Sequence, residues 1–214
     1  MQLTVIDSAS KNEKVRVSDS LFAHSTSELL LAQAIRVYLS NLRQGTAHTK
    51  TRSEINRTKK KWYKQKGTGN ARHGARTPSL FVGGGVAFGP RGIENWTKTL
   101  TSKSKLLALR VALDAQKKNL FLSKNLTSLT GKTKEATTLL AGLGEAQGKV
   151  LVVLTKNNDS ALRSLRNLEN VLVMTADRLN ALHVSMADQI VIEFTALKVL
   201  EDRLTKIKKT TLKK

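Results

Sequence analysis

The sequence predicts an α/β protein, with a mostly parallel sheet flanked by helices and one long basic loop. Two observations, one in each half of the chain, carry this prediction. In the second half, short apolar runs alternate with helical patterns, a rhythm typical of a parallel sheet with helices on both faces. In the first half, a run of 63 residues is rich in basic residues and glycine, and a helical pattern flanks it on each side.

Composition limits the class of protein. A length of 214 residues allows a single globular domain, residues 1–214, with a large excursion. Apolar residues make up 40% of the chain but aromatic residues only 4%, so the core must consist mainly of Leu, Val, Ala and Ile. The absence of cysteine excludes a disulfide scaffold and a thiolate metal site. The net charge of +21 predicts a polyanionic partner.

Hydropathy argues against a membrane protein. No apolar run approaches the roughly 18 residues of a spanning helix. The first residues, MQLTVID, are typical of a strand and not of a secretion signal. We therefore expect a cytoplasmic protein without a membrane partner.

Periodicity places the first elements. Residues 1–6 alternate and are β-branched, as in a strand, and residues 14–17 are a candidate second strand. Apolar residues at helical spacing predict a helix over residues 29–39 that ends near Gly45. Its candidate N-caps are Ser25, Thr26 and Ser27. A second helix, about residues 101–117, follows the loop and sets an apolar stripe beside a basic one.

Strands and helices then alternate to the end of the chain. The expected strands are residues 119–122, 149–154, 170–174 and 189–194. The expected helices are residues 133–143, 159–167 and 195–207, with a short helix or turn at 179–184. The run 149–154 (KVLVVL) is continuously apolar, as in a strand covered on both faces. Residues 206–214 are expected to form a basic C-terminal tail.

The basic loop, residues 43–105, differs from the rest of the chain. It holds fifteen Lys and Arg residues against only Glu54 and Glu94, which gives a net charge of +13. Such a segment cannot bury enough apolar surface to offset the entropy of ordering it. A loop of this length is either functional or a linker. We expect it to be disordered alone and to order on RNA.

The tip of the loop, about residues 58–76, carries the clearest binding signal. Trp62 and Tyr63 lie within a lysine cluster, and aromatic faces stack on unpaired bases. Basic side chains neutralise phosphates, and this mixture favours RNA over a DNA groove, with a solvated linker as the alternative. The candidate RNA-binding residues are Arg43, Lys50, Arg52, Arg57, Lys59, Lys60, Lys61, Trp62, Tyr63, Lys64, Gln65, Lys66, Gly67, Thr68, Gly69, Arg72, His73, Arg76, Arg91, Lys98, Lys103 and Lys105.

The glycines of the loop do not form a nucleotide site. A dinucleotide fingerprint requires a third glycine where Arg72 stands, and a phosphate loop requires Lys and Ser or Thr where Ala75 and Arg76 stand. The glycines are instead expected to let the backbone approach RNA or to reverse sharply. The run 83–91 (GGGVAFGPR) is interpreted either as a hinge or as backbone threaded through a narrow space.

Catalytic constellations are absent from the sequence. The four histidines are scattered, no serine lies in a nucleophile elbow, and His73 is expected to contact RNA. An enzyme of this class would need a pocket at the carboxyl ends of the strands, near Thr155 or Thr175. We therefore expect no enzyme, no catalytic residue, no cofactor and no metal site, apart from magnesium ions carried by the RNA.

The loop also resembles a known family. The matching residues are Lys60, Lys61, Lys64, Gln65, Lys66, Gly67, Thr68, Gly69, Ala71 and Arg72, then residues 83–85 and 88–91, with segments 150–154, 166–168 and 170–173 in the second half. Over nearly its whole length the chain is similar to the bacterial-type large-subunit ribosomal protein L-four. The resemblance implies a three-layer α/β domain whose long extended loop penetrates ribosomal RNA.

The resemblance further implies a role and partners. Such a protein is a structural component of the large ribosomal subunit, aids its assembly, and lines the constriction of the peptide exit tunnel with its loop. The implied partners are large-subunit ribosomal RNA, neighbouring proteins including L-twenty-two, the nascent peptide and, in some members, a leader messenger RNA. The implied tunnel tip is Tyr63, Lys64, Gln65, Lys66, Gly67, Thr68 and Gly69. A regulatory RNA-binding protein acting off the ribosome is the alternative.

This sequence departs from the family pattern near the tip. Asn70 and Val82 stand where the family often has arginine, and Trp62 and Tyr63 stand where it usually has a proline and then an aromatic residue. These changes remove two phosphate contacts and add a ring, so they affect the geometry of the tip.

Overall fold

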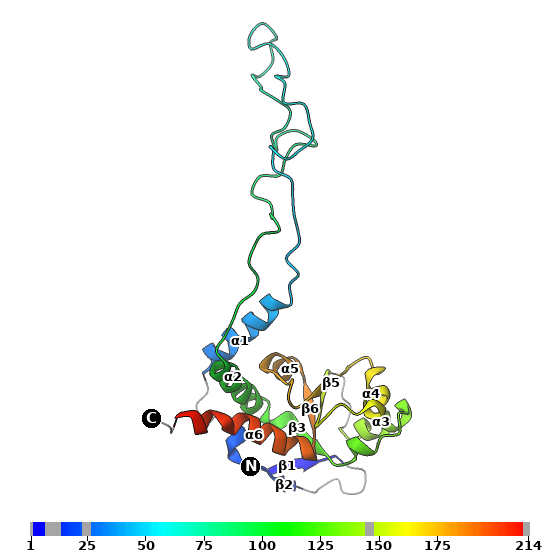
Figure 1. Cartoon of the computed structure of the whole chain (residues 1–214). Coiled ribbons are helices and arrows are strands. Elements are labelled where there is room, and N and C mark those ends of the chain that lie inside the picture. Colours follow the sequence, from blue (N-terminus) through cyan, green and yellow to red (C-terminus); the bar gives the residue numbers. More distant parts are fainter. Residues whose placement is uncertain (1, 7–13, 23–26, 144–147, 212–214) are drawn as a thin grey trace. The chain divides into compact units, whose positions relative to one another are not determined.

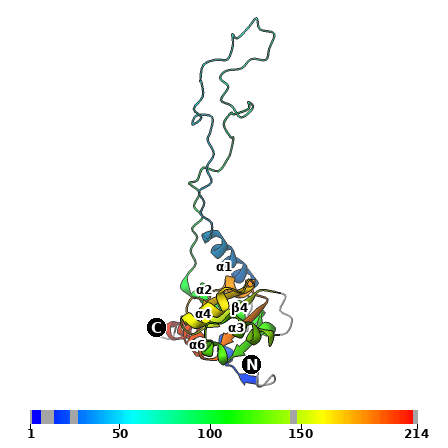
Figure 2. The same ribbon diagram turned by 90° about the vertical axis from the view of Figure 1, so that its right-hand side faces the viewer.

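The computed structural model describes residues 2–6, 14–22, 27–143 and 148–211. Its contacts divide the chain into two units (Figures 1 and 2). The globular unit comprises Met1–Tyr38 and Thr99–Lys214, and the arm comprises Leu39–Lys98. The arm's bounds differ from those expected for the loop, residues 43–105, at both ends: the arm begins at residue 39, and residues 99–105 belong to the globular unit.

The strands and helices follow the expected order with small shifts at their ends. The strands are β1 (Gln2–Val5), β2 (Lys14–Arg16), β3 (Leu120–Ser123), β4 (Val150–Leu154), β5 (Val171–Thr175) and β6 (Gln189–Glu193). The helices are α1 (Glu28–Asn41), α2 (Ser102–Ala115), α3 (Thr133–Ala141), α4 (Asp159–Arg166), α5 (Ala181–Met186) and α6 (Phe194–Thr211). Short 3-10 turns lie at Asp19–Leu21 (η1), Lys117–Asn119 (η2) and Asn125–Ser128 (η3).

Polar residues begin four of the helices. Thr101, Asn158 and Asn180 precede α2, α4 and α5, and each side-chain oxygen accepts a hydrogen bond from a backbone amide of the first turn. Ser27 does the same for α1, because its Oγ accepts from the Leu30 amide at 3.4 Å. These caps satisfy amides that have no partner inside the helix. Two of the predicted α1 caps, Ser25 and Thr26, lie outside the described residues.

The six strands form one mostly parallel sheet in the order β2-β1-β3-β6-β4-β5. Only β1 and β2 pair antiparallel, with Leu3 opposite Val15. The remaining neighbours are parallel, with Val152 of β4 opposite Val173 of β5 and Val191 of β6. This arrangement confirms the predicted sheet.

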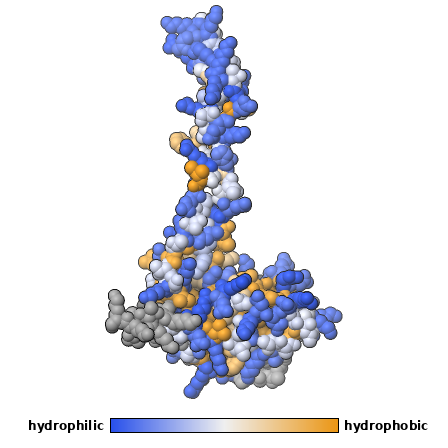
Figure 3. Space-filling view, viewed as in Figure 1, coloured by the Kyte–Doolittle hydropathy of each residue, from blue (hydrophilic) through white to orange (hydrophobic). Residues whose placement is uncertain are grey.

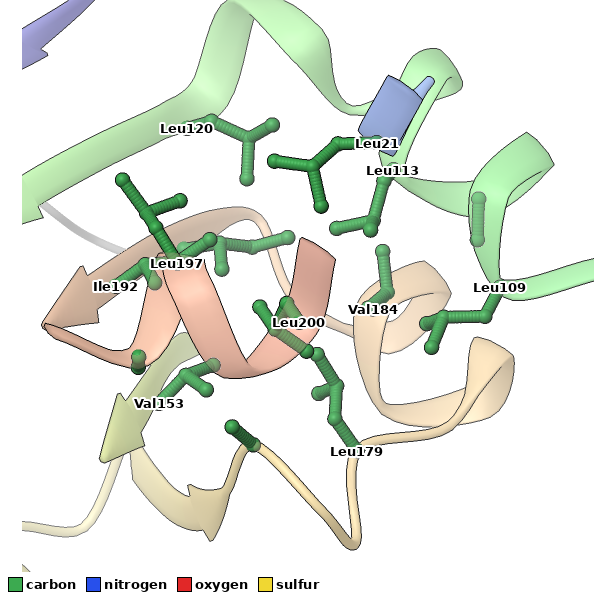
Figure 4. Packing of buried hydrophobic residues seen from close by; sticks show 14 of the residues in the cluster. Leu21, Leu109, Leu113, Leu120, Val153, Leu179, Val184, Ile192, Leu197 and Leu200 are labelled. Carbon is green, nitrogen blue, oxygen red and sulfur yellow. The ribbon is translucent and has the colours of Figure 1, made fainter. Parts of the chain in front are cut away.

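Two hydrophobic cores lie on opposite faces of the sheet. Alternate residues of a strand point to opposite faces, so Leu151 and Val153 of β4 enter one core, whereas Val150, Val152 and Leu154 enter the other. The first core receives residues of α2, α5 and α6 (Figure 4), and the second receives residues of α3 and α4. Every residue of β4 is buried, as its continuous apolar run predicts. The globular unit is therefore a three-layer α/β domain.

The end of the chain differs from expectation. Helix α6 begins at Phe194, directly after β6, and continues through Thr211, so the expected basic tail is helical from residue 206 to residue 211. Residues 212–214 of that tail lie outside the described residues. Within the described part of the chain, no helix has both the length and the apolar character needed to cross a membrane.

Candidate nucleic-acid interface

The arm consists of an outgoing and a returning limb that run side by side (Figures 1 and 2). At its base, Asn41 Nδ2 donates to the Lys98 carbonyl at 3.0 Å, and the Lys98 amide donates to Asn41 Oδ1 at 2.8 Å. Ser40 Oγ donates to the Trp96 carbonyl at 2.6 Å, and the Arg43 guanidinium lies 4.3 Å from the centre of the Trp96 ring. These contacts join the start and the end of the arm.

Further hydrogen bonds, one of them from a side chain, join the limbs again further along. The Thr49 amide donates to the Pro90 carbonyl at 2.8 Å, and His48 Nδ1 donates to the Arg91 carbonyl at 2.7 Å. The Val86 amide donates to the Lys50 carbonyl at 3.0 Å. The arm therefore has a ladder of its own, although it contains no regular strand apart from one isolated bridge between His48 and Arg91.

Glycines allow the limbs to approach each other. A Cβ on Gly85 would lie 2.3 Å from the Arg52 amide nitrogen on the outgoing limb. Within the returning limb, a Cβ on Gly84 would lie 2.0 Å from the Pro78 carbonyl oxygen. Of the two interpretations of this run, threaded backbone is the one that fits. The narrow space is made by the chain's own backbone. The sharp reversals are at Gly67 and Gly69, whose φ angles are +84° and +65°.

Aromatic side chains of the tip form a cluster with Phe81 of the returning limb. The ring centres of Trp62 and Phe81 are 5.4 Å apart, those of Trp62 and Tyr63 are 5.3 Å apart, and those of His73 and Phe81 are 5.1 Å apart. The Arg76 guanidinium lies 4.4 Å from the centre of the Trp62 ring. Trp62 and Tyr63, expected to stack on bases, thus pack on protein rings, and Trp62 remains 46% exposed. Sequence reasoning missed Phe81 because its partners are distant in the chain.

The tip is closed by hydrogen bonds around a reversal of the chain. The Trp62 amide donates to the Gly74 carbonyl at 3.0 Å, and the Tyr63 hydroxyl donates to the Ala71 carbonyl. Lys61 Nζ donates to Gln65 Oε1 at 2.6 Å. The residues of the predicted tunnel tip are exposed except Tyr63, which is half-buried. They therefore form the outer surface of the reversal.

Positive charges far outnumber negative charges on the arm. The structure describes every residue of the arm, which carries thirteen Lys and Arg residues, two acidic residues and no ion pair within 4 Å. Figure 3 shows that hydrophilic residues cover most of its surface. Both carboxylates accept a hydrogen bond within a local turn. Glu54 Oε2 accepts from the Thr51 amide at 2.8 Å, and Glu94 Oε1 accepts from the Arg91 amide at 3.1 Å. These backbone hydrogen bonds are the main reason that the pKa of each carboxyl lies below its ordinary value.

The structure places twenty of the twenty-two candidate RNA-binding residues on the arm. Seventeen of these twenty are exposed, and Arg57, Tyr63 and His73 are half-buried. The Arg57 guanidinium donates to the Val82 carbonyl at 2.9 Å, so it also fastens the two limbs. Lys103 and Lys105 are instead on α2 in the globular unit. The candidates thus gather on the arm, apart from these two lysines.

A hollow of about 340 Å³ does lie where an enzyme of this class would need one. It is at the carboxyl ends of β4 and β6 and is lined by Thr155, Glu193 and Thr195, among others. Glu193 is buried, and its carboxylate accepts hydrogen bonds from the Thr155 amide at 2.7 Å and from the Thr195 hydroxyl. These bonds tie β4 to the β6–α6 junction. In the part of the chain that the structure describes, no three His, Asp or Glu residues gather as metal ligands.

Comparisons with known proteins agree with the resemblance noted in the sequence. The profile of the ribosomal protein L4/L1 family matches residues 15–203, a range that includes the whole arm. The chain is also similar to proteins named large ribosomal subunit protein uL4 in several bacteria.

Three of these relatives show the extent of the match. The protein of Halothermothrix orenii is 36% identical over 194 residues, 90% of this chain and 92% of the relative. That of Parasynechococcus marenigrum is 40% identical over 181 residues, 83% and 85% of the two chains. That of Chlorobium phaeobacteroides is 33% identical over 208 residues, 95% and 100% of the two chains. Because the similarity spans the fold and the arm together, this chain belongs to the ribosomal protein L4/L1 family.

Proposed function

We propose that this protein is a structural component of the large ribosomal subunit and that its arm binds large-subunit ribosomal RNA. The observation that carries the proposal is the arm's set of thirteen basic residues, which form no ion pair with its two carboxylates. Burying such an arm against protein would leave many charges unpaired, whereas RNA phosphates would neutralise them. The names of the similar bacterial proteins support the same role.

The arm acts in this proposal as a strut between RNA segments that would otherwise repel one another. Its cations neutralise phosphates on both sides, and its inter-limb hydrogen bonds define the conformation in which the chain binds. If the free protein already adopts this conformation part of the time, the arm loses less conformational entropy when it binds RNA. The expectation that the arm is disordered without RNA stays a prediction.

The finer proposals concern the tip. We place Lys64, Gln65 and Lys66 at the wall of the peptide exit tunnel, beside the nascent peptide and near ribosomal protein L-twenty-two. The support is the matching KQKGTG sequence together with the exposure of these residues at the end of a closed reversal. The protein would be bound to the ribosome in the cytoplasm, with magnesium ions supplied by the RNA.

Sedimentation tests the proposal most directly. Cell lysate is centrifuged through sucrose at about 0.5 M salt, which screens exposed charges and weakens polyanion binding by orders of magnitude. We expect the protein to remain with the large subunit in a one-to-one ratio, since an arm threaded into folded RNA cannot dissociate by screening alone. If the protein moves to the top of the gradient while the subunits stay intact, it is peripheral or acts off the ribosome as a regulatory RNA-binding protein.

A further inference from the structure

The returning limb carries a bulge of three residues, Ala87, Phe88 and Gly89. On the outgoing limb, two adjacent residues make backbone hydrogen bonds to the returning limb: the Thr49 amide donates to Pro90, and the Lys50 carbonyl accepts from the Val86 amide. Their partners on the returning limb, residues 86 and 90, are four positions apart. The three residues between them take no part in the ladder, so they form a bulge whose last residue, Gly89, still lies against the outgoing limb.

Close contacts on both sides fix the ends of this bulge. Gly85 lies against the Arg52 backbone, where a Cβ would come within 2.3 Å of the amide nitrogen. Gly89 lies against Thr49, where a Cβ would come within 2.1 Å of Oγ1. Because Gly85, just before the bulge, and Gly89, its last residue, are both pressed onto the outgoing limb, the residue at the apex has little freedom to retract toward it.

Phe88 occupies the apex in a strained backbone conformation. Its φ is +55°, and it is the one residue other than glycine with a positive φ among the described residues. A bulky side chain is an outlier in this region, and such outliers persist where the surrounding structure over-determines them. They cluster at sites of binding and catalysis, so the conformation calls for a functional explanation.

The ring of Phe88 is also the one aromatic ring of the arm that stands apart. Trp62, Tyr63 and Phe81 pack in the aromatic cluster, and Trp96 packs on Arg43 at the base. Phe88 is fully exposed and makes no ring contact within the described residues. An exposed phenylalanine on a segment this polar would be costly to keep in water, so its natural environment is an apolar or stacking surface.

We propose that Phe88 is a base-stacking residue: its ring inserts against an unpaired base of the RNA that the arm binds. The inference rests on the proposed function, and it names a specific contact within it. The neighbouring charges suit this partner, because Lys50 lies opposite the bulge and Arg91 follows it, and both are exposed. These cations can bind the phosphates on either side of the base while the Phe88 ring stacks on the face of that base.

The test measures the affinity of the full chain for large-subunit ribosomal RNA transcribed in vitro. Phe88→Leu removes the ring but keeps an apolar side chain, and Phe88→Trp keeps a stacking ring. Val82→Ala is the matched control, because Val82 is an almost fully exposed apolar residue on the same limb. Circular dichroism melting of each variant confirms that the globular unit is folded.

We expect Phe88→Leu to weaken binding by about 5- to 140-fold, the range that loss of one base–aromatic stack produces. The factor should be the same at low and high salt, because the ring neutralises no phosphate. Phe88→Trp should bind within about threefold of the unmodified protein, and Val82→Ala within about twofold. Chemical probing should show one base that is protected by the unmodified protein and reactive with Phe88→Leu.

Several outcomes would overturn the proposal. One is a Phe88→Leu variant that binds as tightly as Val82→Ala, and another is a loss that Phe88→Trp does not restore. Normal binding to naked RNA combined with poor incorporation into subunits would assign Phe88 to a protein partner instead. If the unmodified protein itself fails to bind ribosomal RNA, the proposed function fails, which is a separate result from failure of Phe88 alone.

Discussion

Gly85 and Arg52 lie 33 positions apart in the chain, yet their backbones touch across the arm. A Cβ on Gly85 would lie 2.3 Å from the Arg52 amide nitrogen and 2.6 Å from the Thr51 carbonyl carbon. Both atoms belong to the main chain, so neither can move aside as the end of a side chain can. The contact sets the distance between the limbs beside the Val86–Lys50 hydrogen bond.

Replacing Gly85 with alanine should therefore separate the limbs. The added methyl group has no space, so the Val86 amide should lose its bond to Lys50, and its hydrogen exchange in the RNA-bound protein should accelerate by at least about tenfold. The matched control is Gly74→Ala, since Gly74 has no neighbour within 4 Å of a built Cβ and no positive φ. Unchanged protection of Val86 in Gly85→Ala would show that the limbs are not held at this contact.

Lowering the pH should loosen the turn at Glu54. The pKa of this carboxyl is below its ordinary value of 4.5, mainly because the Thr51 amide donates to the carboxylate. A depressed pKa means that the turn is stabilised above the ordinary pKa and that this stabilisation is lost as the pH falls through the lower, folded value.

Carbon-13 NMR of the Glu54 carboxyl group checks this prediction, with a midpoint expected below 4.5 and a matching shift of the Thr51 amide. In Glu54→Gln the Thr51 amide should show no such titration. A midpoint at or above 4.5 in the unmodified protein would mean that the hydrogen bond does not form in solution.

Deleting residues 59–74 should leave the globular unit intact. The removed segment contributes no residue to either hydrophobic core, and Lys59 and Gly74 line the same surface hollow, so a short Gly-Ser link can rejoin the ends. We expect the melting temperature of the protein alone to change by less than about 3 °C.

Leu200→Ala provides the contrasting variant, because Leu200 is fully buried in the core of the globular unit. Its loss should cost about 2–5 kcal/mol, which lowers the melting temperature by roughly 2–4 °C per kcal/mol. A deletion that destabilises the protein as much as Leu200→Ala would show that the tip supports the fold.

Removing one arm charge should reduce the salt dependence of RNA binding. Lys66→Gln removes an exposed cation at the tip, so the slope of log affinity against log salt should fall in magnitude by about 1. Lys14→Gln is the control, because Lys14 is equally exposed but lies on β2 of the globular unit. Equal effects of the two substitutions would mean that binding is not centred on the arm.

Sequence reasoning located the elements of the globular unit and the segment that forms the arm. The run KVLVVL predicted a strand covered on both faces, and all of β4 is buried. Ser27, one of the three candidate caps, accepts a hydrogen bond from the Leu30 amide at the start of α1. These predictions succeeded because strand and helix periodicity and capping act over a few neighbouring residues.

The arrangement within the arm was not predictable in the same way. Trp62 and Tyr63 suggested base stacking, but Trp62 packs against Phe81, which is 19 residues away and shares no periodic pattern with it. Phe88 stood inside a glycine-rich run that was open to two interpretations, and nothing local marked its positive φ.

The sequence by itself determined that this chain forms a layered α/β domain and carries a polycationic segment, because composition, charge and short-range periodicity are properties of neighbouring residues. Only the tertiary structure decided which aromatic rings pack against one another and which glycines lie against the backbone of the other limb. It also decided which aromatic side chain stays exposed to solvent. Those outcomes depend on contacts between limbs that are tens of residues apart, where one hydrogen-bond register turns Ala87–Gly89 into a bulge and places Phe88 at its apex.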